Sequence, residues 1–347
     1  MDKLIGIVAA ILGLGLLMVV HESGHLLAAR AFGMKVLKFS IGIGPAIWRH
    51  KPKNSDTIYQ VGPVPFMAYV QIHGMNPLED IDPDDKESYA NASLIARITA
   101  IFAGPLANYL FASILFLGAI LVGGEKKATL NVDTVSEDMP AAAAGFKSGD
   151  TIKSINGEQL ETWKDLLATV QSNPEKKLEV LVEREGGVQT LFVTPKKNAE
   201  GKGLIGISSK ETREPVPFGK AAKLAVVMPA ELVGQMLASL GRLITLKEKA
   251  ELGGPIRISE EITKSVKHGP DSYLMLLGVL STWLAVFNLL PVPALDGGRL
   301  MFLGYEAITR RRANAKVEAT VHLVGMAVLL MLLLVVSVGD VGRLAGS

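Results

Sequence analysis

Long apolar runs alternate with charged segments along this chain. No charged residue occurs from Leu4 to Val20, from Ile98 to Gly124 or from Ser272 to Leu295. A helix that crosses the hydrocarbon core of a bilayer needs about 20 predominantly apolar residues. The pattern therefore predicts four transmembrane helices, over residues 4–29, 98–124, 273–295 and 319–339.

A fifth apolar stretch, residues 224–240, is interrupted by Pro229 and Glu231. Its large apolar side chains recur every four residues. That spacing indicates an amphipathic helix that lies on the membrane or against the protein.

The charges beside the predicted spans indicate their orientation, because Lys and Arg gather in cytoplasmic loops. Basic residues follow the first and third spans: Arg30, Lys35, Lys38, Arg49, Lys51 and Lys53, then Arg299, Arg310, Arg311, Arg312 and Lys316. We expect both of these loops in the cytoplasm, and both termini and the loop 125–270 outside. A fifth span over 224–240 would place the two basic loops on opposite sides.

Composition agrees with a membrane protein that also has water-facing parts. Of the 347 residues, 49% are hydrophobic and 20% are charged, and the mean hydropathy is +0.32. The net charge of +2 gives no indication of nucleic-acid binding. The chain has no Cys, which excludes disulfides, iron–sulfur clusters and thiolate zinc sites. Any metal must be held by His and carboxylate side chains, which suits a catalytic zinc.

Three ionisable residues interrupt the first apolar run in the pattern His21-Glu22-Ser23-Gly24-His25. On a helix, His21 and His25 lie one turn apart and face the same way, so both imidazoles can reach one cation. Glu22 lies beside that position, where a general base belongs. One alternative is a hydrogen-bonded pair of core histidines, in which a buried Glu22 would lack a partner. The other is a signal peptide, whose cleavage after Ala29 would remove the whole motif.

A catalytic zinc needs a third protein ligand. Asp296 is the best candidate, because it follows Pro291 and Pro293 and precedes two glycines. These residues interrupt a helix, and irregular backbone at membrane depth is tolerated only beside protein or a water-filled cavity. Such a break can aim Asp296 at the metal. The alternative is an ordinary helix end, with Asp296 in a polar turn at the membrane surface.

The His21–His25 motif, together with Asn288 and Asp296-Gly297, resembles the signature pair of the site-2 proteases, which are intramembrane zinc metalloproteases. A further block of that family is matched by Arg97-Ile98, Ala103-Gly104-Pro105 and Asn108. The resemblance covers essentially the whole chain. It implies that His21, His25 and Asp296 bind Zn²⁺ and that Glu22 is the catalytic base.

The same resemblance assigns parts of the chain to substrate handling, namely Asn288 and the prolines Pro291 and Pro293. It also places residues 58–74 as the family's membrane-associated β-hairpin loop. In that loop Tyr69 and Val70 would bind an unwound substrate, although this chain has Met67-Ala68 where the family usually has Gly-Gly. The implied substrates are single-span membrane proteins, such as anti-sigma factors or remnant signal peptides, cut in regulated intramembrane proteolysis.

Residues 129–196 have the pattern of a small α+β unit. We expect strands at 132–135 and 151–155, a helix at 163–171 capped by Thr162, and a hairpin of 178–184 with 189–194. The run from Pro140 to Gly157 resembles a PDZ domain of the bacterial protease type. The resemblance implies that peptide C-termini bind near Ala141–Phe146; alternatively, the domain only filters substrates by size.

The sequence thus predicts a polytopic α-helical membrane protein with four transmembrane helices, an inserted extracytoplasmic α+β PDZ domain and a membrane-associated β-hairpin loop. Residues 1–124 and 271–347 are expected to form the two membrane catalytic halves. Residues 125–200 are expected to form the PDZ domain, and residues 201–270 the segment that follows it. We expect a multi-pass protein of the cell (inner) membrane, active near the cytoplasmic side on transmembrane substrates, with no nucleic-acid partner. The alternatives are an inactive scaffold that presents its PDZ domain, and a metal transporter, for which the number of spans is low.

Overall fold

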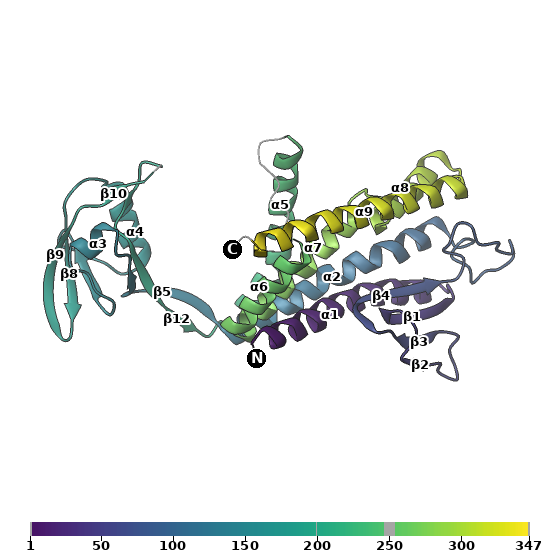
Figure 1. The fold of residues 1–347 in the computed structure, drawn as a ribbon, viewed down its shortest axis with the longest axis horizontal. Helices are drawn as coiled ribbons and strands as arrows, with labels where there is room; N and C mark the ends of the chain where they lie inside the picture. The colour runs from purple at the N-terminus through teal and green to yellow at the C-terminus, as the bar shows by residue number, and fades with distance from the viewer. Residues whose placement is uncertain (1, 199, 246–253, 346–347) are drawn as a thin grey trace. The chain divides into compact units, whose positions relative to one another are not determined.

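The computed structural model describes residues 2–198, 200–245 and 254–345. The chain forms two compact units (Figure 1). We call Met1–Val122 with Pro217–Ser347 the membrane unit, and Gly123–Val216 the inserted unit.

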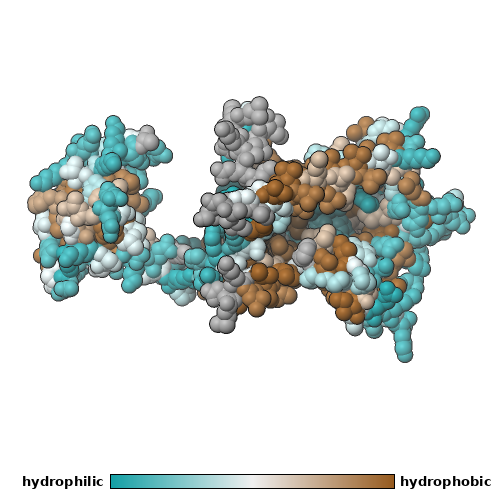
Figure 2. All heavy atoms as spheres, in the orientation of Figure 1, coloured by the Kyte–Doolittle hydropathy of each residue, from teal (hydrophilic) through white to brown (hydrophobic). Residues whose placement is uncertain are grey.

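Helices dominate the membrane unit: α1 (Asp2–Ala31), α2 (Leu94–Gly123), α5 (Phe218–Ile244), α6 (Pro255–His268), α7 (Pro270–Leu289), α8 (Asp296–Thr309) and α9 (Ala315–Ala345). Among the described residues, α1, α2, α5, α7 and α9 are long and apolar enough to cross a membrane. The predicted spans 4–29 and 319–339 lie within α1 and α9, and 98–124 matches α2 to within one residue at its end. The predicted span 273–295 is too long, because α7 ends at Leu289. α5 is a fifth candidate. Figure 2 shows hydrophobic residues over much of the helical bundle of this unit.

The contacts of α1 fix the directions of its neighbours. Gly24 near the end of α1 meets the Ala103 carbonyl near the start of α2, whereas Leu17 packs against Leu115 near the other end of α2. α2 is therefore antiparallel to α1. Conversely, Gly13 meets Leu277 of α7, and the end of α1 meets the residues that follow α7. α7 is therefore parallel to α1.

A four-stranded sheet follows α1, made of β1 (Val36–Ile43), β2 (Trp48–His50), β3 (Ile58–Val61) and β4 (Val64–Ile72) in the order β2-β3-β1-β4. β3 pairs parallel with β1, and β4 pairs antiparallel with its other side. The predicted hairpin over 58–74 is therefore wrong. β1 separates the two strands, and the positive φ of Gly42 and the close backbone approach of Gly62 to Ile43 allow this crossing.

The free edge of β4 matters for the site. In the described part of the chain, β4 pairs only with β1, so its other edge keeps unpaired backbone groups, as edge strands do.

The inserted unit contains a sheet in the order β12-β5-β6-β8-β9, with helix α4 (Trp163–Ser172). Its other elements are β5 (Glu125–Val135), α3 (Pro140–Ala143), β6 (Thr151–Ile155), β7 (Glu158–Gln159), β8 (Leu178–Arg184), β9 (Gly187–Val193), β10 (Lys196–Lys197), β11 (Gly203–Leu204) and β12 (Ile207–Glu214). The predicted strands, hairpin and Thr162 cap are present. The unit continues past residue 200, because β12 pairs with β5.

The predicted carboxylate-binding segment, Ala141–Phe146, forms α3 and a tight turn. Five of its backbone N–H groups already donate to carbonyl oxygens: those of Ala141, Ala142, Ala144, Gly145 and Phe146. Capture of a carboxylate requires a row of free donors. The structure therefore gives no support to this position for peptide C-termini.

One ion pair is buried in the inserted unit. The Asp150 carboxylate is fully buried and accepts hydrogen bonds from Arg184 at 2.7 and 2.8 Å and from the Lys147 N–H at 2.9 Å. Burial alone raises the pKa of a carboxyl group, but these hydrogen bonds and the charge of Arg184 outweigh it. The pKa of Asp150 is therefore below its ordinary value of 3.8.

We expect Arg184→Met to lower the unfolding free energy of the unit, expressed as residues 123–216, by about 3 kcal/mol, because Asp150 is left buried and unpaired. Urea unfolding at pH 7 measures this loss. Lys153→Met is the control, since the Lys153–Glu183 pair is exposed and contributes under about 1 kcal/mol. Equal losses in the two variants would contradict the prediction.

The same pair sets a pH dependence. A depressed carboxyl pKa stabilises the fold above the unfolded pKa, and this contribution disappears as pH falls toward the folded pKa. Stability should therefore drop below pH 3.8 in the wild type and less steeply in Arg184→Met.

Candidate metal centre

Three side chains from two distant parts of the chain meet in the membrane unit. His21 and His25 lie one turn apart on α1, and Asp296 is the first residue of α8. The two His Nε2 atoms are 3.2 Å apart. Asp296 Oδ2 lies 3.1 Å from His21 Nε2 and 3.4 Å from His25 Nε2. In the described part of the chain this is the single His, Asp and Glu cluster of metal-binding size.

These spacings fit a zinc ion. Zn–N and Zn–O bonds of about 2.0–2.1 Å in a tetrahedron place neighbouring ligand atoms about 3.3 Å apart. Asp296 Oδ2 is also buried and accepts no well-aligned hydrogen bond from any described residue. A buried carboxylate oxygen without a donor needs a cation. Two imidazoles and one carboxylate leave a fourth position for water, as in catalytic zinc sites.

The break between α7 and α8 delivers Asp296. α7 ends at Leu289 before Pro291 and Pro293, and Ala294 has a φ of 74°. A side chain at Gly297 would overlap the Leu290 carbonyl, so only glycine allows the start of α8 to lie this close to the end of α7. The interruption predicted from the prolines and glycines is present.

α9 supports this break, which the sequence did not reveal. The Ala294 N–H donates to His322 Nδ1 at 2.9 Å. Gly325 lies so close to Pro293 that a larger residue would overlap it. The segment that carries Asp296 is therefore held from the side by α9.

Glu22 has a partner from the sheet. Its Oε2 accepts a hydrogen bond from the Val70 N–H at 2.9 Å. Val70 lies on β4, so a backbone donor of this edge strand points at the carboxylate beside the metal cluster. A missing partner for Glu22 therefore no longer counts against the alternative of a core histidine pair; the position of Asp296 Oδ2 beside both imidazoles does.

α2 supplies contacts to the imidazoles that sequence reasoning had not assigned. The Ala100 carbonyl lies 2.8 Å from His25 Nδ1. A side chain at Gly104 would overlap the His25 ring, so glycine makes room for that imidazole. The block Ala103-Gly104-Pro105 is thus a packing surface for the motif on α1.

A groove of about 440 Å³ follows β4 from Tyr69 to Ile72 and reaches Arg299 of α8. Tyr69 and Val70 both line it. By contrast, the Asn288 side chain donates to the Leu284 carbonyl of its own helix at 3.0 Å. The structure brings Val70 to Glu22, whereas Tyr69 lines a groove that none of the metal-cluster residues borders. A substrate role for Tyr69, Val70, Asn288, Pro291 and Pro293 stays a prediction.

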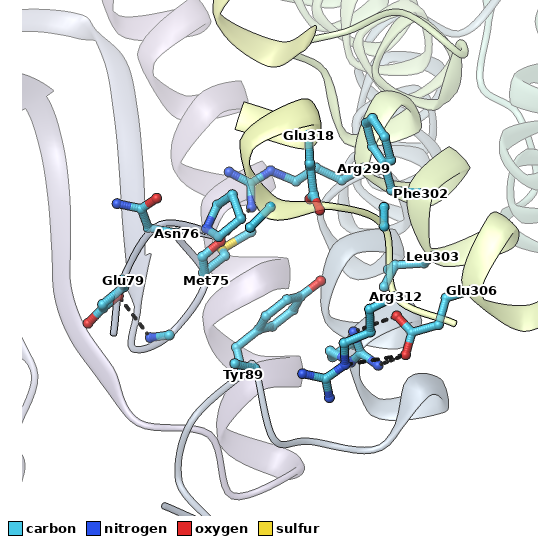
Figure 3. Close-up of a pocket in the computed structure, with 16 residues that line it drawn as sticks. Met75, Asn76, Glu79, Tyr89, Arg299, Phe302, Leu303, Glu306, Arg312 and Glu318 are labelled. Carbon is cyan, nitrogen blue, oxygen red and sulfur yellow. Dashed lines mark hydrogen bonds and ion pairs between the residues drawn. The ribbon is translucent and has the colours of Figure 1, made fainter. Parts of the chain in front are cut away.

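A second cavity of about 180 Å³ lies between the loop after β4 and α8 (Figure 3). Glu306 in its wall pairs with Arg97 at 2.5 and 3.0 Å, and this charge holds the pKa of Glu306 below its usual range. Arg97 is buried, so the pair ties the start of α2 to α8. None of the three metal-cluster residues lines this cavity.

The fold and the cluster define a membrane-embedded metallohydrolase. A model of peptidase family M50 matches residues 9–332, and the chain belongs to this family. It is an intramembrane zinc metalloprotease, with Zn²⁺ as its cofactor.

Relatives match over nearly their whole length. The regulator of sigma-W protease RasP of Bacillus subtilis is 28% identical, over 97% of this chain and 98% of that protein. The zinc metalloprotease RasP of Bacillus licheniformis is also 28% identical, over 97% and 99%. A candidate zinc metalloprotease of Clostridium perfringens is 32% identical, over 96% and 98%.

We expect Gly104→Ala to abolish stoichiometric zinc binding, because the added methyl group displaces the His25 ring. Metal analysis of the purified protein measures the zinc content. Gly118→Ala on the same helix is the control, since its methyl group meets Leu274 at an ordinary 3.4 Å. Full zinc content in Gly104→Ala would contradict the proposed packing.

Proposed function

We propose that the protein hydrolyses peptide bonds within transmembrane segments of single-span membrane proteins. The observation that carries this proposal is the tetrahedral spacing of His21, His25 and Asp296 beside Glu22, within a bundle of apolar helices. Anti-sigma factors and remnant signal peptides are substrates of the expected kind, and the name of the Bacillus subtilis relative, a regulator of sigma-W, agrees with the former.

His21, His25 and Asp296 would hold the zinc ion, which supplies Lewis acidity for a bound water and the scissile carbonyl. Glu22 takes a proton from the attacking water and passes it to the leaving amine. Among the described residues the metal-binding group contains only these three, which would leave a fourth position for water or substrate.

A substrate helix must unwind before attack, because its carbonyls are held in helical hydrogen bonds. The free edge of β4 can bind the unwound stretch as an added strand. A substrate carbonyl that accepts the Val70 N–H would also release Glu22 from its 2.9 Å hydrogen bond. Substrate binding and release of the base are then coupled at one backbone donor. Asn288, Pro291 and Pro293 would border the same substrate.

We also propose four spans, with α5 on the outer membrane surface. α1 and α7 are parallel and α2 is antiparallel to them, so the segment between α2 and α7 begins and ends on the same side. If α5 crossed the membrane once, this segment would instead begin and end on opposite sides. α6 has 14 residues, or about 21 Å of helix, too short for a return through about 30 Å of hydrocarbon. In Figure 1, α5 runs crosswise to α1, α2, α7 and α9.

The inserted unit, on this topology, is an extracytoplasmic PDZ domain. PDZ domains bind peptides by strand addition to a sheet edge, and β9 and β12 are the edge strands of its main sheet. It would either bind peptide C-termini or restrict access to the membrane site by size.

We expect Glu22→Gln to lower cleavage of a single-span reporter by at least about a hundredfold, because the proton acceptor is lost, while zinc content stays unchanged. Ser23→Ala is the matched control in the same motif, since its hydroxyl bonds only to the Val19 carbonyl. Purified protein in detergent and gel analysis of the fragments measure the effect. Undiminished cleavage by Glu22→Gln would refute the assignment, and an inert wild type would favour the scaffold alternative.

Single cysteines test the four-span topology, because the chain has none of its own. We expect an impermeant maleimide to label Lys176→Cys on intact spheroplasts, and Lys53→Cys and Arg311→Cys only after permeabilisation. All three positions are exposed. Labelling of Lys53→Cys and Arg311→Cys from opposite sides would show instead that α5 crosses the membrane.

A further inference from the structure

The geometry of the cluster dictates where His21 carries its proton. Its Nε2 atom faces His25 Nε2 and Asp296 Oδ2, so Nε2 must offer its lone pair to a zinc ion. A neutral imidazole then has its N–H at Nδ1. A metal-binding His almost always donates this second N–H to an acceptor that fixes the ring.

The two imidazoles differ in how this requirement is met. His25 has a backbone acceptor, the Ala100 carbonyl, 2.8 Å from its Nδ1. Among the described residues, the polar neighbour of His21 Nδ1 is the side-chain amide of Asn108, whose Nδ2 lies 3.4 Å away. Asn108 is fully buried. Its other amide atom, Oδ1, has no hydrogen-bond partner among the described residues.

Packing of α2 against both α1 and α7 fixes the position of Asn108. Ala100, Gly104 and Asn108 follow one another at intervals of four residues, so all three lie on the face of α2 that meets α1. The buried Ser281 hydroxyl of α7 donates to the Asn108 carbonyl at 2.8 Å and holds this level of α2 from the other side.

Metal binding decides which end of the amide faces His21. With Nδ2 toward Nδ1, the ring must carry its proton on Nε2, where it blocks coordination. A half-turn of the amide places Oδ1 there instead, at nearly the same volume. Because Oδ1 has no partner, this turn breaks no hydrogen bond of the oxygen.

We propose that Asn108 is the positioning residue of His21, whose Nδ1–H it accepts through Oδ1 so that Nε2 is free to bind zinc. This inference rests on the proposed zinc site and adds a role that the three ligands and Glu22 do not cover. Asn108 acts through His21 and does not touch the substrate.

Two substitutions at this position separate an acceptor from a donor. Asn108→Asp has nearly the same shape and as a carboxylate can only accept, so we expect its zinc affinity to stay within about threefold of the wild type or to increase. Asn108→Leu fills similar space without a polar atom, so we expect a loss of about 10–100-fold, as for other outer-shell partners. Competition with a chelator, on purified full-length protein, measures zinc affinity without an activity assay.

Thr282→Val is the matched control. It removes a different fully buried polar group of the bundle, a hydroxyl that among the described residues bonds within α7, to the Gly278 carbonyl. Its zinc affinity should equal that of the wild type. Histidine ¹⁵N correlation spectra add a direct readout: His21 should carry its proton on Nδ1 in the zinc-bound wild type and in Asn108→Asp, and this signal should shift in Asn108→Leu.

The outcomes are distinct. If Asn108→Asp loses zinc as strongly as Asn108→Leu, the amide acts as a donor and the proposal is wrong. It is also wrong if Asn108→Leu keeps the wild-type affinity and the His21 signal. If the wild type binds no zinc, or His21→Ala binds it as tightly as the wild type, the proposed metal site itself fails.

Discussion

Backbone contact between α1 and α2 governs the position of both imidazoles. Gly24 and Gly104 carry no side chains at the crossing, so the Ala100 carbonyl can reach His25 and the His25 ring can occupy the space beside Gly104. An imidazole ligand must be held within about 0.5 Å and about 10–20° of its productive geometry to serve a metal. Rigid helices that meet backbone to backbone provide this accuracy better than loops do.

The position of Asp296 depends on a different feature, the interruption between α7 and α8 within the membrane unit. Exposed backbone there must be satisfied by protein, and His322 of α9 does so for Ala294. The buried Arg97–Glu306 pair then ties α8 to the start of α2. The same α2 therefore positions the two imidazoles and anchors the helix that begins with Asp296.

On the proposed function, substrate recognition and chemistry would share the edge of β4. Its Val70 N–H holds Glu22 at rest, and the same strand borders the groove that leads to Arg299. A β-edge offers backbone groups to any sequence, which suits an enzyme that must bind unwound segments of varied side chains. The chemistry would then begin only when an extended chain replaces Glu22 at this donor.

Local patterns in the sequence determined the apolar helices, the inserted unit, the His21–Glu22–His25 motif and the helix break before Asp296. Each depends on residues close together in the chain: a run of apolar side chains, a one-turn spacing, or two prolines followed by two glycines. Tertiary structure alone decided that β1 lies between β3 and β4, that β12 completes the inserted unit, and that Val70, Gly104 and Asn108 meet the motif. These contacts join residues tens of positions apart, and the periodicity of a single element does not indicate which distant surface that element will pack against.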